Sequence, residues 1–151
     1  MNITLDVSGA LKEIGKVASD YSDKSISMAL FSTAQAGIQV IQDRTEKGKG
    51  YKGNLKPYTP SYAAWKTKPK RRSKSGYLLG GGAVSTKVNL SLTGDMLRGM
   101  QAKKGNRFAE IYFAGSPERG KKAVWNNRTR PFFGFSAKER KALMKHFVSV
   151  L

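Results

Sequence analysis

The strongest helical pattern in the chain is the stretch DKSISMALFSTAQAGIQVIQDR, residues 23–44. Its apolar side chains recur every three or four residues, at Ile26, Leu30, Ala34, Ile38 and Ile41. That spacing places them on one face of an α-helix. The side-chain oxygen of Asp23 or Ser25 can accept a hydrogen bond from a free amide of the first turn and so cap the helix. We therefore predict a long amphipathic helix whose apolar face packs on the core.

Two shorter helical patterns lie near the ends of the sequence. Residues 8–21, SGALKEIGKVASDY, carry apolar side chains at helical spacing and predict a short helix before the long one. Near the other end, Ser136 and Glu139 form a capping box, S-A-K-E, in which each side chain can bond the backbone amide of the other residue. The helix that this box opens should face the core with Leu143, Phe147 and either Val150 or Leu151.

A hairpin signal lies in the second half of the chain. Gly105 and Asn106 are turn formers, and the β-prone residues Phe108, Ile111 and Phe113 follow them. This pattern predicts two antiparallel strands over residues 100–115.

Short helices are predicted on both sides of the hairpin. The Thr93 hydroxyl can cap one that contains Met96 and Leu97, and Pro117 suits the first turn of another over residues 116–127. Two N-terminal helices, the second one long, a small antiparallel sheet and a C-terminal helix together predict an α+β fold. At 151 residues the chain has the size of one ordinary domain, so we predict a single domain over residues 1–151.

The middle of the chain differs in composition from both flanks. Residues 46–82 are dense in Gly, Pro, Lys and Arg, and only the island SYAAWK has a helical pattern. We predict an extended basic loop or arm here, with the glycines at 80–82 as a flexible joint. Because long segments without regular structure are uncommon in compact domains, we expect the arm to become ordered on assembly.

Net charge is the most pronounced feature of the composition. The chain has 28 Lys and Arg against 10 Asp and Glu, a net charge of +18, which predicts contact with polyanions, with acidic protein surfaces or with both. It has no cysteine, which excludes disulfides and thiolate metal sites. No stretch approaches the roughly 18 to 20 apolar residues that span a bilayer, and the opening MNITLDVSG lacks the features of a signal peptide. We therefore expect a soluble, unexported protein with no membrane partner.

Residues suited to catalysis are scarce. The only histidine, His146, lies in the last helical pattern, where a surface or packing role is more frequent than a catalytic one. The carboxylates are scattered singly, and no GxxxxGK[ST] phosphate loop occurs. We therefore predict that the protein is not an enzyme and has no catalytic, cofactor-binding or metal-binding residues, no cofactor and no small-molecule substrate.

A basic cluster lies within the predicted arm and consists of Lys66, Lys68, Lys70, Arg71, Arg72 and Lys74. Tyr58, Tyr62 and Trp65 precede it. Cations next to aromatic rings suit phosphate neutralisation combined with base stacking, so the six cations are candidate contacts to DNA or to an acidic partner. In the alternative interpretation the loop is solvated, and its aromatic side chains pack on the core or on a neighbouring subunit.

An ordered set of motifs in residues 50–140 resembles one protein family. The motifs are PYTPSYAAWK (57–66), VNLSLTGDMLRGM (88–100), AEIYFAG (109–115), KKAVWNN (121–127) and RTRPFFGFSAKE (128–139). Together they resemble the phage virion morphogenesis, or tail-completion, family of neck and minor-tail proteins, which has Mu-like members. The basic run at 66–74 and the glycines beyond it depart from that pattern, because they are more basic and richer in glycine.

The resemblance implies a non-catalytic structural protein of the virion, at the head–tail junction or in the tail, that assembles in the host cytoplasm. Its implied partners are copies of itself in a ring, a hexamer or a dodecamer, and adjacent neck, connector or tail proteins. DNA in the channel is a further candidate partner. The alternative function is a nucleic-acid-binding module that uses residues 47–74.

Eight residues are candidate subunit contacts in such a ring: Thr93, Asp95, Trp125, Arg130, Pro131, Phe132, Phe133 and Phe135. The RPFFGF segment would form a rigid turn whose apolar side seats on the core or on the next subunit. For at least two of the phenylalanines, packing in the chain's own core is the alternative. Trp125 would be either an interface anchor or core filling, whereas Thr93 and Asp95 would first fix the start of a helix.

Overall fold

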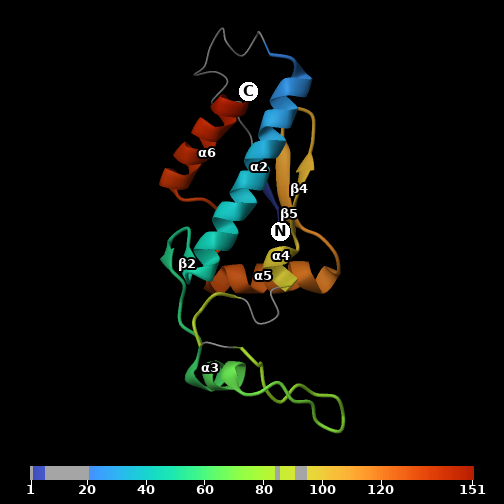
Figure 1. The fold of residues 1–151 in the computed structure, drawn as a ribbon, viewed down its shortest axis with the longest axis vertical. Coiled ribbons are helices and arrows are strands. Elements are labelled where there is room, and N and C mark those ends of the chain that lie inside the picture. The colour runs from blue at the N-terminus through green and yellow to red at the C-terminus, as the bar shows by residue number, and fades with distance from the viewer. Residues whose placement is uncertain (1, 6–20, 84–85, 91–94) are drawn as a thin grey trace.

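The structure, a computed structural model, describes residues 2–5, 21–83, 86–90 and 95–151. The elements in chain order are β1 (Ile3–Leu5), α2 (Asp23–Glu46), β2 (Lys49–Gly50), β3 (Gly53–Asn54), α3 (Pro60–Thr67), α4 (Asp95–Arg98), β4 (Met100–Lys104), β5 (Ala109–Phe113), α5 (Pro117–Thr129) and α6 (Ala137–Val150). They make an α+β fold, as predicted (Figure 1). The helix predicted over residues 8–21 and the Thr93 cap lie outside the described residues.

Helix α2 is the longest element and confirms the amphipathic pattern. Its N-cap is Ser22, whose Oγ accepts a hydrogen bond from the Ser25 amide at 3.2 Å, so the predicted caps Asp23 and Ser25 both lie inside the first turn. The fully buried apolar residues of this helix are Ile26, Leu30, Ala34 and Ile41. Gly37 permits a close approach, because a Cβ at this position would lie only 2.8 Å from the ring of Phe135.

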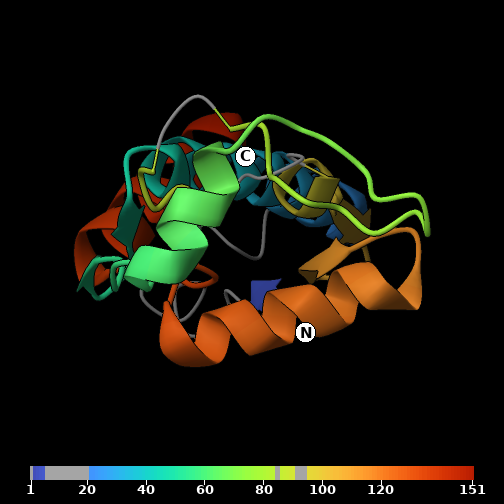
Figure 2. The same cartoon turned by 90° about the horizontal axis from the view of Figure 1, so that it is seen from below.

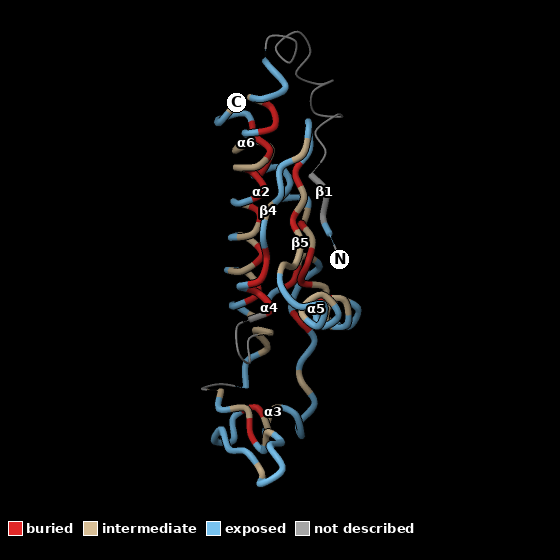
Figure 3. The backbone as a smooth tube through the Cα atoms, turned by 90° about the vertical axis from the view of Figure 1, so that its right-hand side faces the viewer, coloured by how far each residue is buried: buried red, intermediate tan, exposed pale blue. Residues whose placement is uncertain are grey.

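A three-stranded antiparallel sheet in the order β1-β5-β4 packs against α2. The predicted hairpin is confirmed, with Met100 opposite Phe113 and Lys104 opposite Ala109. Strand β1, which was not predicted, adds to the free edge of β5. Helix α6 packs along α2, and Figure 3 shows that the buried parts of the helices and of the sheet face each other. The body of the protein therefore has a helical layer and a sheet layer, in which α2 packs against the sheet and α6 packs along α2.

The last two helices follow their predicted signals. Helix α5 has Pro117 in its first turn and extends to Thr129, beyond the predicted end. Helix α6 begins at the predicted capping box, in which the Ser136 Oγ and the Glu139 carboxylate each accept a hydrogen bond from the other residue's amide. Among the described helices, none is both long and apolar enough to cross a membrane.

The middle segment contains more regular structure than predicted. Glu46 still belongs to α2, β2 and β3 form a short hairpin, and α3 covers the predicted helical island. After α3 the chain turns back at residues 73–77 and returns beside itself, with a β-bridge between Arg72 and Leu78. We call residues 56–83 the basic arm. It projects beyond α5 at the lower end of the body in Figures 1 and 3, and Figure 2 looks at this end from below.

Replacing the fully buried Phe147 by Ala should destabilise the body by about 3 to 5 kcal/mol, because it leaves a cavity between α6 and α2. Urea denaturation followed by circular dichroism measures this loss. Val148→Ala removes an exposed side chain from the same helix and is the control, with an expected change of less than about 1 kcal/mol. Equal losses in the two variants would show that α6 does not pack on α2 through this face.

Candidate assembly surface and basic arm

The RPFFGF segment forms a turn between α5 and α6, and its phenylalanines point into the chain's own core. Phe132, Phe133 and Phe135 are 0%, 4% and 8% exposed. The rings of Phe132 and Phe133 also pack on Phe113 of β5, with centroids 6.3 and 4.9 Å away. Their apolar surface is already covered within the chain, which supports the alternative of core packing over contact with a neighbouring subunit for these three side chains.

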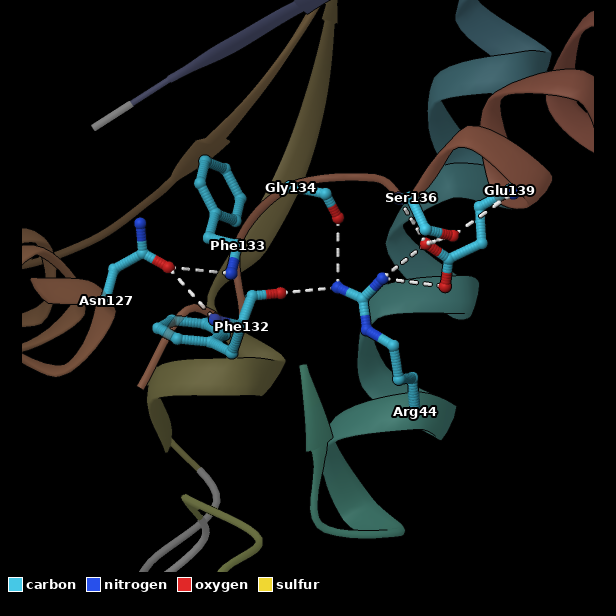
Figure 4. A network of polar contacts seen from close by, with 7 residues as sticks. All are labelled: Arg44, Asn127, Phe132, Phe133, Gly134, Ser136 and Glu139. Carbon is cyan, nitrogen blue, oxygen red and sulfur yellow. Dashed lines mark hydrogen bonds and ion pairs between the residues drawn. The ribbon is translucent and has the colours of Figure 1, made fainter. Parts of the chain in front are cut away.

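Arg44, in the last turn of α2, connects this turn to α2 and to the start of α6 (Figure 4). Its Nη1 donates to both carboxylate oxygens of Glu139, at 2.7 and 2.6 Å. Its Nη2 donates to the carbonyl oxygens of Phe132 and Gly134. Because a guanidinium presents its donors in a fixed plane, one side chain fixes the helix start and the turn together. Nothing in the sequence pattern distinguished Arg44 from the other cations of the chain.

Asn127 holds the other side of the turn. Its side-chain oxygen accepts hydrogen bonds from the amides of Phe132 and Phe133, at 3.0 and 2.9 Å (Figure 4). The carbonyl of Pro131 accepts a hydrogen bond from the Tyr51 amide at 3.2 Å and lies so close to Gly50 that no side chain fits there. The turn is therefore a junction between α2, the β2–β3 hairpin, α5 and α6.

Arg130 links this junction to the basic arm. Its guanidinium donates to the carbonyl oxygens of Lys56 and Pro57, at 2.8 and 3.1 Å. It also lies 4.8 Å from the ring centre of Tyr58, where the negative face of an aromatic ring attracts a cation. Arg130 therefore positions the start of the arm, although its side chain remains partly exposed.

Lys66 ties α3 to the segment that follows the arm, residues 87–89, and is not a surface cation. It is 1% exposed, and its Nζ donates to the carbonyl oxygen of Lys87 at 2.7 Å and to Asn89 Oδ1 at 3.0 Å. The ammonium also lies over the Tyr58 ring, and burial lowers the pKa of Lys66. The prediction that Lys66 contacts DNA or an acidic partner is therefore wrong for this structure, because its ammonium is enclosed by its own chain.

The other five predicted cations of the arm, Lys68, Lys70, Arg71, Arg72 and Lys74, are all exposed. Of the predicted subunit contacts outside the phenylalanines, Trp125 is 64% exposed on α5 and Pro131 is partly exposed. Asp95 is the first residue of α4, and Thr93 lies outside the described residues. Helix α5, which carries Trp125 and is followed by Arg130 and Pro131, lies at the end of the body from which the arm with the five cations projects (Figure 1).

The Glu139 carboxylate makes the stability of this junction dependent on pH. Burial raises the pKa of Glu139, but hydrogen bonds from Ser136 and Arg44 outweigh that effect and hold the pKa below its usual 4.5. A carboxylate with a lowered folded-state pKa stabilises the fold above its unfolded-state pKa, and this contribution is lost as pH falls through the folded-state pKa. The free energy of unfolding should therefore decrease as the solution is acidified from about pH 5 to pH 3.

Glu139→Gln should reduce both the stability at neutral pH and this acid dependence. Because the variant leaves the Arg44 charge without its partner, we expect a loss of about 2 to 4 kcal/mol at pH 7, measured by urea denaturation. Glu118→Gln is the control: Glu118 is exposed and lies 3.5 Å from Lys121, so its loss should cost less than about 1 kcal/mol. A Glu139→Gln variant as stable as the Glu118→Gln control would contradict the role assigned to the pair.

Within the described part of the chain, no three His, Asp or Glu side chains are grouped so that they could hold a metal ion. Comparisons of the chain with protein-family models, with curated proteins and with solved structures find no match. The functional inference therefore depends on the residues themselves and on the resemblance of their motifs.

Proposed function

We propose that the protein is a structural subunit of a tailed-phage particle, a neck or tail-completion protein that assembles with copies of itself into a ring. In this proposal the ring lies at the head–tail junction or at the tail end and contacts adjacent virion proteins. The ordered motifs from PYTPSYAAWK to RTRPFFGFSAKE support it through their resemblance to the tail-completion family. The protein acts by assembly and not by catalysis.

The exposed Trp125 is the observation that carries the assembly proposal. It lies on α5 with 64% of its surface exposed, although tryptophan has the largest apolar surface of any side chain. Exposed tryptophans are enriched at the centres of protein interfaces, where their burial supplies much of the binding free energy. The Trp125 side chain thus has apolar surface available for a second copy of the chain.

The proposed interface contains fewer residues than the eight that were predicted from the sequence. Because Phe132, Phe133 and Phe135 fill the chain's own core, they act only by holding the turn in shape. Among the predicted contacts whose exposure the structure describes, a neighbouring subunit can reach Trp125, Pro131 and the exposed part of Arg130. In this proposal the phenylalanines stabilise the fold of the chain, and Trp125 contacts the neighbouring subunit.

Mass determination and negative-stain microscopy of the purified protein in 1 M salt without nucleic acid test the proposal. We expect closed rings, because an apolar contact survives salt that screens charges. Trp125→Ala should weaken assembly about 30-fold or more, the effect of losing an interface anchor, while leaving the unfolding free energy of the monomer nearly unchanged.

Met28→Ala is the matched control, because Met28 is 50% exposed near the start of α2, at the other end of that helix from the junction with the turn. It should assemble like the unmodified protein. A chain that stays monomeric at every concentration in high salt, or two variants that assemble equally well, would contradict an interface centred on Trp125.

A further inference from the structure

The basic arm lies in a long stretch of the chain without negative charge. Between residues 47 and 94 the sequence has eleven Lys and Arg and no Asp or Glu. Five of these cations are exposed within residues 68–74, and the ion pairs of the described structure involve none of them. Among the described residues no carboxylate pairs with these cations, so their positive charges add at one place.

The two limbs of the arm, which precede and follow the turn at residues 73–77, are joined by backbone hydrogen bonds, so the backbone that carries the cations has a defined position. The amides of Leu79 and Gly82 donate to the carbonyl oxygens of Arg71 and Lys68 at 2.8 Å each, and that of Gly81 donates to Trp65 at 2.9 Å. Gly80 allows this approach, because a Cβ there would lie 2.4 Å from the carbonyl oxygen of Pro69. The glycines predicted as a flexible joint are thus the place where the limbs pack most closely.

Aromatic rings are displayed beside these cations. Tyr77, at the turn between the limbs, is 74% exposed, and the turn is closed by hydrogen bonds between Ser73 and Tyr77. At the base of the arm, Tyr62 is 38% exposed and packs on Tyr58 and Trp65. Exposed ring faces next to cations match a ligand that carries both phosphates and flat bases, whereas an acidic peptide segment offers carboxylates alone.

We propose that the basic arm binds the sugar–phosphate backbone of nucleic acid without sequence preference, through Lys68, Lys70, Arg71, Arg72 and Lys74. Tyr77 adds affinity for a strand with unpaired bases by stacking on a base. Lys66 and Arg130 are positioning residues, because they anchor the arm and do not face the ligand. The inference goes beyond the proposed structural role and depends on the arm alone, so it can fail while ring assembly holds.

Fluorescence anisotropy with labelled 30-nucleotide DNA, single-stranded and duplex, tests the proposal over a series of salt concentrations. The test variant K68Q/K70Q/R71Q/K74Q removes four charges and keeps Arg72, which donates to the Gly76 carbonyl oxygen and so supports the turn. We expect its Kd for both DNAs to rise at least about tenfold, and the slope of log Kd against log salt to fall by up to about 3.

The matched control is K122Q/K138Q/K141Q/K145Q, which removes four exposed charges from α5 and α6. It should bind DNA within about threefold of the unmodified protein, because loss of general charge far from the site affects binding only weakly. Equal losses in the two variants would overturn the proposal and assign binding to the net charge of the whole protein. Polyglutamate of matched charge that binds as tightly as DNA would overturn it in favour of an acidic protein partner.

Two single substitutions test the geometry without changing any charge. Gly80→Ala should separate the limbs and weaken DNA binding, whereas Gly120→Ala, where an added Cβ meets nothing within 4 Å, should not. Tyr77→Ala should weaken single-stranded binding about tenfold and duplex binding little, because only unpaired bases offer a free face. Unchanged binding in both Gly80→Ala and Tyr77→Ala would contradict a structured arm as the site.

Discussion

The ion pair in which Nη1 of Arg44 donates to both carboxylate oxygens of Glu139 is the interaction on which the other parts depend. Arg44 lies in the last turn of α2 and Glu139 in the first turn of α6, so their contact joins the two main helices, while the second guanidinium nitrogen holds the turn that places the phenylalanines. The side chains of the two residues are 10% and 20% exposed. Because charged hydrogen bonds strengthen where water is scarce, this contact is worth more than an ion pair on the surface.

Local sequence patterns predicted most of the helices and strands correctly, but they did not predict which side chains contact one another. The long helix, the hairpin over residues 100–113, the capping box and the helix at 60–67 follow from apolar spacing, turn formers and side-chain caps, which act within a few residues. Strand β1 was missed, although N-I-T-L-D-V alternates, because three residues give too short a signal. Arg44 and Lys66 were missed as structural residues, because their partners lie far along the chain and a sequence does not distinguish one cation from another. Asn127 was missed although its partners, the amides of Phe132 and Phe133, follow it closely in the sequence.

The same limit explains the outcome for the candidate site. RPFFGF was identified as a special segment, but its sequence does not distinguish rings that pack inside the chain from rings offered to a neighbour. Burial separates them: the phenylalanines are enclosed, whereas Trp125 on the preceding helix is exposed. In the arm, likewise, six cations of similar appearance divide into one that is enclosed under Tyr58 and five that face solvent.

The basic arm leaves the body and returns to it at nearly one place. Its first limb begins beside Arg130, next to the β2–β3 hairpin. After its second limb the chain comes back to the same region, where a Cβ added at Gly48 would lie 3.2 Å from the carbonyl oxygen of Val88. Because the two ends of the arm lie close together and the body is complete without it, the arm is an insertion into the body. Such a segment can lengthen, shorten or change its charge over evolutionary time while the body keeps its fold, so that the arm and the body are free to diverge separately.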